Sequence, residues 1–137
     1  MLLVAYKGKG SVWDSSIRLW TNSIYSHCEL VIDNVCYSSS IQDGGVRPKS
    51  INIYNGNWDI IQLTKFNELK ALNYYQKTKS NKYSYSDLVF NQILNTRFNN
   101  PNGQFCSEWC AEALGIPNAG IYSPDKLVDL IKFMEAI

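Results

Sequence analysis

One histidine and one cysteine in this chain have the residue types and the neighbours that a thiol nucleophile and its base would need. His27, the only histidine, lies in the stretch Ser-His-Cys-Glu-Leu-Val-Ile, and Cys106 lies in the run Phe-Cys-Ser-Glu-Trp-Cys near the other end. A cysteine attacks as its thiolate, and an ordinary thiol has a pKa of about 8.5. An imidazole beside the sulfur could take the proton and return it to a leaving group. The histidine comes first in the sequence, which is an unusual order for such enzymes.

The surroundings of Cys106 favour a reactive thiol. We expect a helix over residues 106–114, after a loop at 99–103 and before a stop at Gly115. At a helix start, unpaired backbone N–H groups and the positive end of the helix dipole stabilise the thiolate. The N–H of Cys106 would also point toward an oxyanion at the attacked carbonyl. The alternative is a small buried apolar residue, which is how we interpret Cys110 one turn later.

A hydrophobic period of two over residues 25–33 predicts a strand that carries the histidine. One face of this strand holds His27, Glu29 and Val31, and the other face holds Cys28, Leu30 and Ile32. Glu29 is about 6.6 to 6.8 Å along the strand from His27, so its carboxylate can bind one imidazole nitrogen and turn the other toward the sulfur.

Other residues compete with Glu29 for this orienting role. Side chains directly opposite on a neighbouring strand lie closer, at about 4.5 to 5.5 Å. Three polar residues of the returning segment are therefore alternatives: Ser39, Ser40 and Gln42. An exposed strand position without a catalytic role is the other interpretation of Glu29.

The remaining pattern predicts a strand-rich first half followed by helices. We expect further strands over residues 2–6, 35–39, 51–54 and 58–63, and helices over 12–21, 65–79, 85–94 and 124–135. Asp33-Asn34 and Gly44-Gly45 are turn signals. Thr64 would cap the helix of residues 65–79, and Ser123 before Pro124 is a strong start for the last helix. This order predicts an α+β fold.

Length and composition bound the class of protein. The chain has 137 residues, 45% hydrophobic and 13% aromatic, which is typical of one globular domain over residues 1–137. A formal net charge of +1 argues against a nucleic-acid-binding face. No apolar run approaches the roughly 20 residues that span a bilayer, so we expect no membrane insertion. The apolar start, residues 1–6, is short and lacks a basic beginning, so we expect no signal peptide and a cytoplasmic protein.

The four cysteines are best interpreted as free thiols. They are Cys28, Cys36, Cys106 and Cys110, an even number that would also allow disulfides. Without a secretion signal, reduced cysteines are the better expectation. A structural zinc site built from His27 and cysteines is an alternative, although no Cys-x-x-Cys pair is present.

Taken together, three short motifs resemble a known family. They are a Ser-His-x-Glu-Leu strand, a Gly-Gly-Val-Arg segment and a Phe-Cys-Ser-Glu sequence that opens a helix. In this order they resemble the circularly permuted branch of the NlpC-type papain-like hydrolases, which includes YiiX-like and YaeF-like proteins and, more distantly, the lecithin retinol acyltransferase group. In ordinary NlpC-type enzymes the cysteine helix precedes the histidine strand, and in the permuted branch the order is reversed, as here. The resemblance extends from Lys7 through the helix that follows Ser123.

The resemblance implies a fold, a reaction and a set of site residues. It implies a small papain-like α+β domain, with an antiparallel sheet packed against the cysteine-bearing helix and further helices. Cys106 would be the nucleophile, His27 the base and Glu29 the third polar residue, with no metal and no cofactor. The implied substrates are amide, ester or thioester carbonyls, with cell-wall peptides prominent among them. One departure is Cys28, which stands where an apolar residue is expected.

The leading hypothesis is a cysteine hydrolase, of the peptidase or amidase kind, that works through an acyl-enzyme on Cys106. A second hypothesis is an acyltransferase or lipid esterase on the same scaffold, because the same three residues can pass an acyl group to another acceptor. A lipid substrate would predict an apolar groove near the cysteine, lined by Trp13, Trp20 and Trp109. A third hypothesis is a non-catalytic binding module or a zinc-stapled domain.

Overall fold

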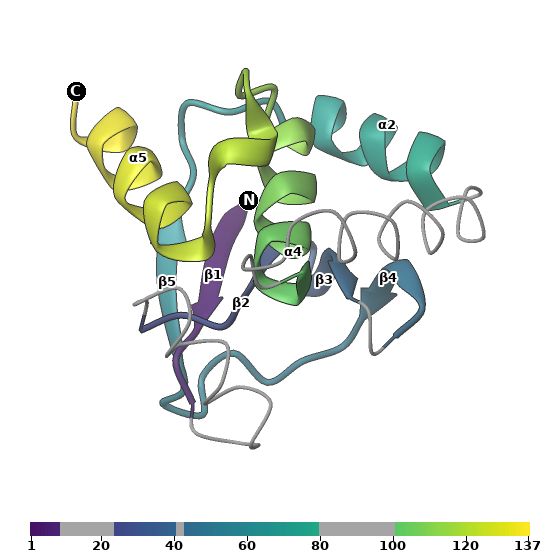
Figure 1. Cartoon of the computed structure of the whole chain (residues 1–137), viewed down its shortest axis with the longest axis horizontal. Helices are drawn as coiled ribbons and strands as arrows, with labels where there is room; N and C mark the ends of the chain where they lie inside the picture. The colour runs from purple at the N-terminus through teal and green to yellow at the C-terminus, as the bar shows by residue number, and fades with distance from the viewer. Residues whose placement is uncertain (9–23, 41–42, 80–100) are drawn as a thin grey trace.

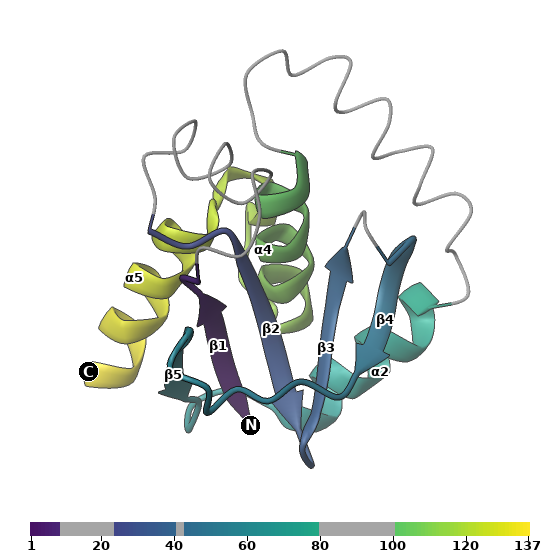
Figure 2. The same ribbon diagram turned by 90° about the horizontal axis from the view of Figure 1, so that it is seen from below.

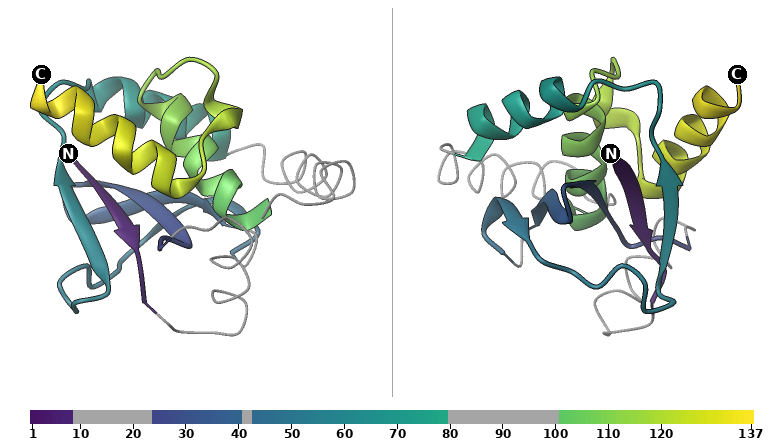
Figure 3. Two further views of the ribbon diagram at one scale, coloured as in Figure 1. Left: turned by 60° about the vertical axis from the view of Figure 1, so that its left-hand side comes forward. Right: turned by 180° about the vertical axis from the view of Figure 1, so that it is seen from behind.

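A five-stranded antiparallel sheet carries the candidate residues, and helices pack against one of its faces (Figures 1 and 3). The computed structural model describes residues 1–8, 24–40, 43–79 and 101–137. The strands are β1 (Leu2–Tyr6), β2 (His27–Ile32), β3 (Val35–Ser40), β4 (Gly45–Lys49) and β5 (Trp58–Gln62), in the spatial order β4-β3-β2-β1-β5. The helices are α2 (Glu68–Thr78), α4 (Pro101–Ala113) and α5 (Pro124–Ala136), with a short 3₁₀ turn at Ala119–Ile121. The expected α+β class is confirmed.

Strand β2 lies in the middle of the sheet and shows the expected alternation. Cys28, Leu30 and Ile32 are buried in the main core under the helices, on what we call the helix face. Val31 belongs to a second apolar cluster on the opposite side, which we call the far face. Because successive strand residues point to opposite faces, His27 and Glu29 share the far face with Val31.

The chain between β4 and β5 crosses the far face of the sheet (Figure 2). The strand expected over residues 51–54 is wrong, because this stretch forms turns instead. The side chain of Asn52 accepts a hydrogen bond from the N–H of Tyr54 at 3.1 Å, a local turn that competes with strand pairing. Ile53 is only 6% exposed and packs in the cluster with Val31.

Two tight turns fix the register of the strands around the candidate residues. Asp33 and Asn34 have φ values of 50° and 64°, as a two-residue hairpin turn between β2 and β3 requires. Gly44 and Gly45 also have positive φ, at 80° and 128°. Both turns were expected from the sequence. They place β2, β3 and β4 side by side in an antiparallel meander.

Helix α4 begins earlier than the sequence led us to expect. Its first residue is Pro101 rather than Cys106, so residues 101–103 are helical and not part of a loop. Proline is favoured at the first helical position, because its N–H is not needed there and its φ is already suitable. The helix ends at Ala113, just before the expected stop at Gly115, which has a φ of 75° and donates its N–H to the carbonyl of Glu112.

The start of α2 also differs from expectation. The cap is Asn67, whose side chain accepts the N–H of Lys70, and not Thr64. Leu69 is 65% exposed, and the buried residue of this helix is Ala71.

The start of α5 at Ser123 and Pro124 is confirmed. The helices expected over residues 12–21 and 85–94 lie outside the described residues. Within the described part of the chain, no helix is long and apolar enough to cross a membrane.

Candidate active site

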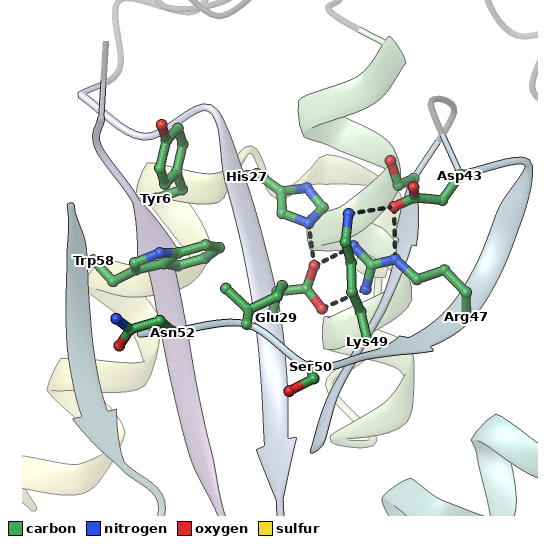
Figure 4. A pocket seen from close by; sticks show the side chains of 11 residues that line it. Tyr6, His27, Glu29, Asp43, Arg47, Lys49, Ser50, Asn52 and Trp58 are labelled. Atoms are coloured by element: carbon green, nitrogen blue, oxygen red, sulfur yellow. Dashed lines mark hydrogen bonds and ion pairs between the residues drawn. The ribbon is translucent and has the colours of Figure 1, made fainter. Parts of the chain in front are cut away.

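His27 and Glu29 form a close pair on the far face of β2. The distance from His27 Nε2 to Glu29 Oε1 is 2.5 Å (Figure 4). The Glu29 side chain is fully buried, whereas that of His27 is 16% exposed. Burial would raise the pKa of Glu29, but the charge of His27 and the hydrogen bonds from Arg47 outweigh it and lower that pKa. The carboxylate is therefore ionised and can fix the orientation of the imidazole, which is the role expected for Glu29.

Arg47 completes this arrangement, and sequence reasoning gave it no role. Its Nη1 donates to Glu29 Oε2 at 2.7 Å, its Nη2 to Glu29 Oε1 at 2.5 Å, and its Nε to Asp43 Oδ2 at 2.8 Å. These two carboxylates raise the pKa of Arg47 against the opposing effect of burial. A planar guanidinium binds a carboxylate through two parallel hydrogen bonds, which fixes its orientation. We call His27, Glu29, Arg47 and Asp43 the charged network.

The register of three strands explains how Arg47 reaches Glu29. Ser38 pairs with Arg47 across β3 and β4. Leu30 pairs with Tyr37 across β2 and β3, so continuing that register by one residue puts Glu29 opposite Ser38. Residues directly opposite share a face, and the small Ser38 side chain leaves room above it. The long arginine therefore spans β3 and meets the carboxylate.

Cys106 is a residue of α4 and interacts electrostatically with His27. Its side chain is fully buried. Burial would raise the pKa of Cys106, but hydrogen bonding from Cys28 and the charge and hydrogen bonding of His27 lower it to about 5. Burial would lower the pKa of His27, but Cys106 and Glu29 raise it well above its usual value. The structure thus brings the three expected residues together, and the directions of the pKa shifts favour a Cys106 thiolate beside a His27 imidazolium and a Glu29 carboxylate.

The physical basis expected for the Cys106 thiolate was partly wrong. Because α4 begins at Pro101, Cys106 lies in the second turn of the helix. The dipole effect falls off within the first turn, and an N–H at this position bonds to the carbonyl four residues back. The helix start therefore supplies neither the charge at the sulfur nor an oxyanion donor from Cys106. The side chains of His27 and Cys28 stabilise the thiolate instead.

A cleft of about 470 Å³ adjoins the charged network on the far face. Tyr6 and Trp58 form one side of it, with ring centroids 5.0 Å apart, and the charged network forms the other (Figure 4). His27 contributes to its lining, but Cys106 does not. The imidazole therefore lies between this cleft and the sulfur.

The alternatives to Glu29 do not occupy its position. Ser38 rather than Ser39 faces Glu29, and its hydroxyl donates to the carbonyl of Cys28 at 2.7 Å. Ser40 lines the cleft, and Gln42 lies outside the described residues. Glu29 is also not an exposed strand residue, because its side chain has no accessible surface.

Trp109, which the lipid hypothesis alone would place in a groove, is packed in the core. It is 1% exposed, and its Nε1–H donates a hydrogen bond to the hydroxyl of Thr78 at 3.0 Å. Its ring is tilted against that of Tyr74, with the two ring centroids 5.7 Å apart. The other two tryptophans of that prediction, Trp13 and Trp20, lie outside the described residues. The described part of the chain thus gives no apolar groove from these residues.

Cys110 is buried in the core as expected, and all four cysteines are reduced thiols. Within the residues that the structure describes, no group of three or more His, Cys, Asp and Glu side chains could hold a metal ion. No protein-family model, no curated protein sequence and no solved structure matches the chain. The functional argument therefore depends on the geometry of the site.

Proposed function

We propose that the protein is a cysteine hydrolase that cleaves an amide or ester bond through an acyl-enzyme on Cys106. The observation that carries this proposal is the position of His27, which interacts with the Cys106 thiol on one side and the Glu29 carboxylate on the other. A nucleophile, a base and a group that orients the base are the three parts that acyl transfer to a side chain requires.

In the proposed reaction, Cys106 Sγ bonds to the carbonyl carbon of the substrate. The His27 imidazolium then gives its proton to the leaving amine or alcohol, and an acyl thioester remains. Next, His27 takes a proton from water, whose oxygen attacks the thioester and releases the acid. Glu29 keeps one imidazole nitrogen bound throughout, and Arg47 keeps Glu29 ionised. Arg47 and Asp43 are positioning residues, because they act through Glu29.

The order of the residues supports a permuted papain-like fold within the α+β class. The histidine strand comes before the cysteine helix, and the two are packed together as the family would require. On this basis we propose peptide-like amides, cell-wall peptides among them, as the leading substrate class. The acyltransferase and lipid esterase alternative is less well supported, because Trp109 is not available as a groove wall.

A non-catalytic binding module is the second candidate, and one observation favours it. Cys106 has no exposed surface and does not line the described cleft, so a substrate carbonyl has no direct route to it through that cleft. A binding module would use the cleft beside Tyr6 and Trp58 and would leave the thiol unused. The two candidates differ in whether Cys106 ever carries an acyl group.

Acylation by a small activated ester distinguishes them. After brief incubation of the full chain with p-nitrophenyl acetate at neutral pH, we expect one acetyl group on Cys106, found by mass spectrometry of the intact chain and its peptides. Loss of the base should slow this acylation in a His27→Ala variant by about 10²- to 10⁴-fold. Cys36→Ser is the matched control, because Cys36 is a buried thiol of the far-face cluster and should not affect the rate.

Acetylation spread over several cysteines or lysines, at rates that His27→Ala does not change, would contradict the hydrolase proposal. A chain that never acquires an acetyl group on Cys106, while its fold is intact by circular dichroism, would favour the binding module.

A further inference from the structure

Three thiols meet where β2 packs against α4. Cys28 Sγ lies 3.8 Å from Cys106 Sγ and 3.8 Å from Cys110 Sγ. Cys106 and Cys110 are one helical turn apart on α4, so both face the same strand. Cys28 is therefore the central sulfur, in contact with the other two. We call these three residues the thiol cluster.

The proposed hydrolysis uses only one of these sulfurs. All three side chains are fully buried, and small neighbours such as Ala5 and Ala111 let the helix approach the sheet closely. Cys36 is different, because it lies in the separate apolar cluster on the far face. The chain thus carries a thiolate with two additional thiols beside it and a fourth thiol that is outside their reach.

We propose that the thiol cluster is a site of oxidation by peroxide, in which Cys28 captures an oxidised Cys106 as a disulfide and then passes that disulfide to Cys110. The oxidant is a small hydroperoxide, because only a small molecule suits a sulfur without exposed surface. This inference requires Cys106 to be a reactive thiolate, but it does not require hydrolase activity.

The first two steps are a two-electron oxidation followed by a condensation. The Cys106 thiolate attacks one oxygen of hydrogen peroxide; an S–O bond forms, the O–O bond breaks, and the other oxygen leaves as water after taking a proton from the His27 imidazolium. The Cys28 sulfur then attacks the sulfenic sulfur of Cys106. An S–S bond forms, the S–O bond breaks, and the departing hydroxide takes the Cys28 proton as water. The two sulfurs must close from 3.8 Å to about 2.05 Å.

The third step is a thiol exchange without net oxidation. Cys110 attacks Cys28, to which it is as close as Cys106 is, and Cys106 leaves. A thiol of lower pKa leaves faster, and the pKa of Cys106 is lowered to about 5. The Cys110 proton goes to the His27 imidazole, which restores the imidazolium beside Cys106. The exchange therefore ends with a Cys28–Cys110 disulfide and a restored Cys106 thiolate.

The sequence allows each thiol to be located separately. We would treat the full chain with one equivalent of hydrogen peroxide, denature it in the presence of N-ethylmaleimide to block the free thiols, and digest with a protease that cuts after glutamate. Cleavage at Glu29 separates Cys28 from Cys36, and cleavage at Glu108 separates Cys106 from Cys110. We expect the four free thiols to fall to two, with a Cys28–Cys110 link and blocked, reduced Cys106.

Variants test each step. In Cys110→Ser the Cys28–Cys106 disulfide should persist. In Cys28→Ser, treated with two equivalents of hydrogen peroxide beside an identically treated unaltered chain, Cys106 should proceed to the sulfinic acid, with two added oxygens. Cys36→Ser is the matched control and should behave as the unaltered chain. Sulfinic acid on Cys106 at equal yield with and without Cys28 would overturn the capture step. A stable Cys28–Cys106 link in the unaltered chain would overturn the transfer to Cys110.

Discussion

The two faces of β2 differ in almost every physical respect, although their residues alternate along one six-residue strand. On the helix face, Cys28 lies among apolar side chains and thiols under α4. On the far face, the neighbouring Glu29 is held by a buried arginine and a histidine. His27 is the first residue of the strand and interacts with groups of both kinds, the Glu29 carboxylate and the Cys106 thiol.

This difference shows how the protein can keep a thiolate in its core. A buried charge is costly unless it has a partner. The far face supplies that partner through a chain of paired charges from Asp43 through Arg47 and Glu29 to His27. The helix face supplies close packing around the sulfur. We infer that Cys28 and the charged network together keep the Cys106 thiol ionised, while the thiol cluster determines its redox chemistry.

Of the variants that compare the two faces, one without Arg47 should show the largest loss in the free energy of unfolding. Arg47→Ala leaves the Glu29 carboxylate buried beside His27 alone, and breaking a buried ion pair in this way costs about 3–5 kcal/mol. The matched control is Lys49→Ala on the same strand, because the Lys49 side chain is 51% exposed and its pair with Asp43 spans 3.6 Å. Such an exposed pair contributes about 0–1 kcal/mol.

Urea denaturation of both variants measures these free energies of unfolding. If Arg47→Ala unfolds at the same urea concentration as Lys49→Ala, the charged network does not stabilise the far face.

A variant on the helix face, Cys110→Ala, should lower the stability of the protein without changing the ionisation of the Cys106 thiol. Cys110→Ala removes one buried sulfur and should lower the free energy of unfolding by about 1 kcal/mol, as loss of a single buried group does. It should leave the Cys106 thiol ionised, because His27 and Cys28 rather than Cys110 lower that pKa. Denaturation and thiol titration of the same variant check both parts. A Cys106 pKa that rises in Cys110→Ala as far as in His27→Ala would show that the two faces are not separate in function.

Much of the local structure around the site could be predicted from the sequence. The period of two predicts which residues of β2 lie on each face, and Asp33-Asn34 predicts the hairpin between β2 and β3. Both features depend only on residues that are close in sequence. The position of Glu29 beside His27 follows from the same period. Its buried environment does not, because it depends on Arg47, which is 18 residues away in sequence and reaches it across an intervening strand.

The errors have physical reasons as well. Pro101 was interpreted as part of a loop with its asparagine and glycine neighbours, although proline is also favoured at the first position of a helix. Residues 51–54 do not pair as a strand, because the side chain of Asn52 accepts the backbone N–H of Tyr54 in a local turn. The three-sulfur contact could not be predicted, because it requires the packing of α4 on β2.

A pH titration of the Cys106 thiolate tests the central claim most directly. Thiolates absorb in the ultraviolet and thiols do not, so the difference in absorbance between the unaltered chain and Cys106→Ser reports ionisation without requiring a reagent to reach the buried sulfur. Our account predicts that the thiolate is lost only as the pH falls through a midpoint of about 5, and that His27→Ala raises this midpoint. A midpoint at about 8.5 or above, unchanged in His27→Ala, would contradict the account, because it is the value of an ordinary thiol.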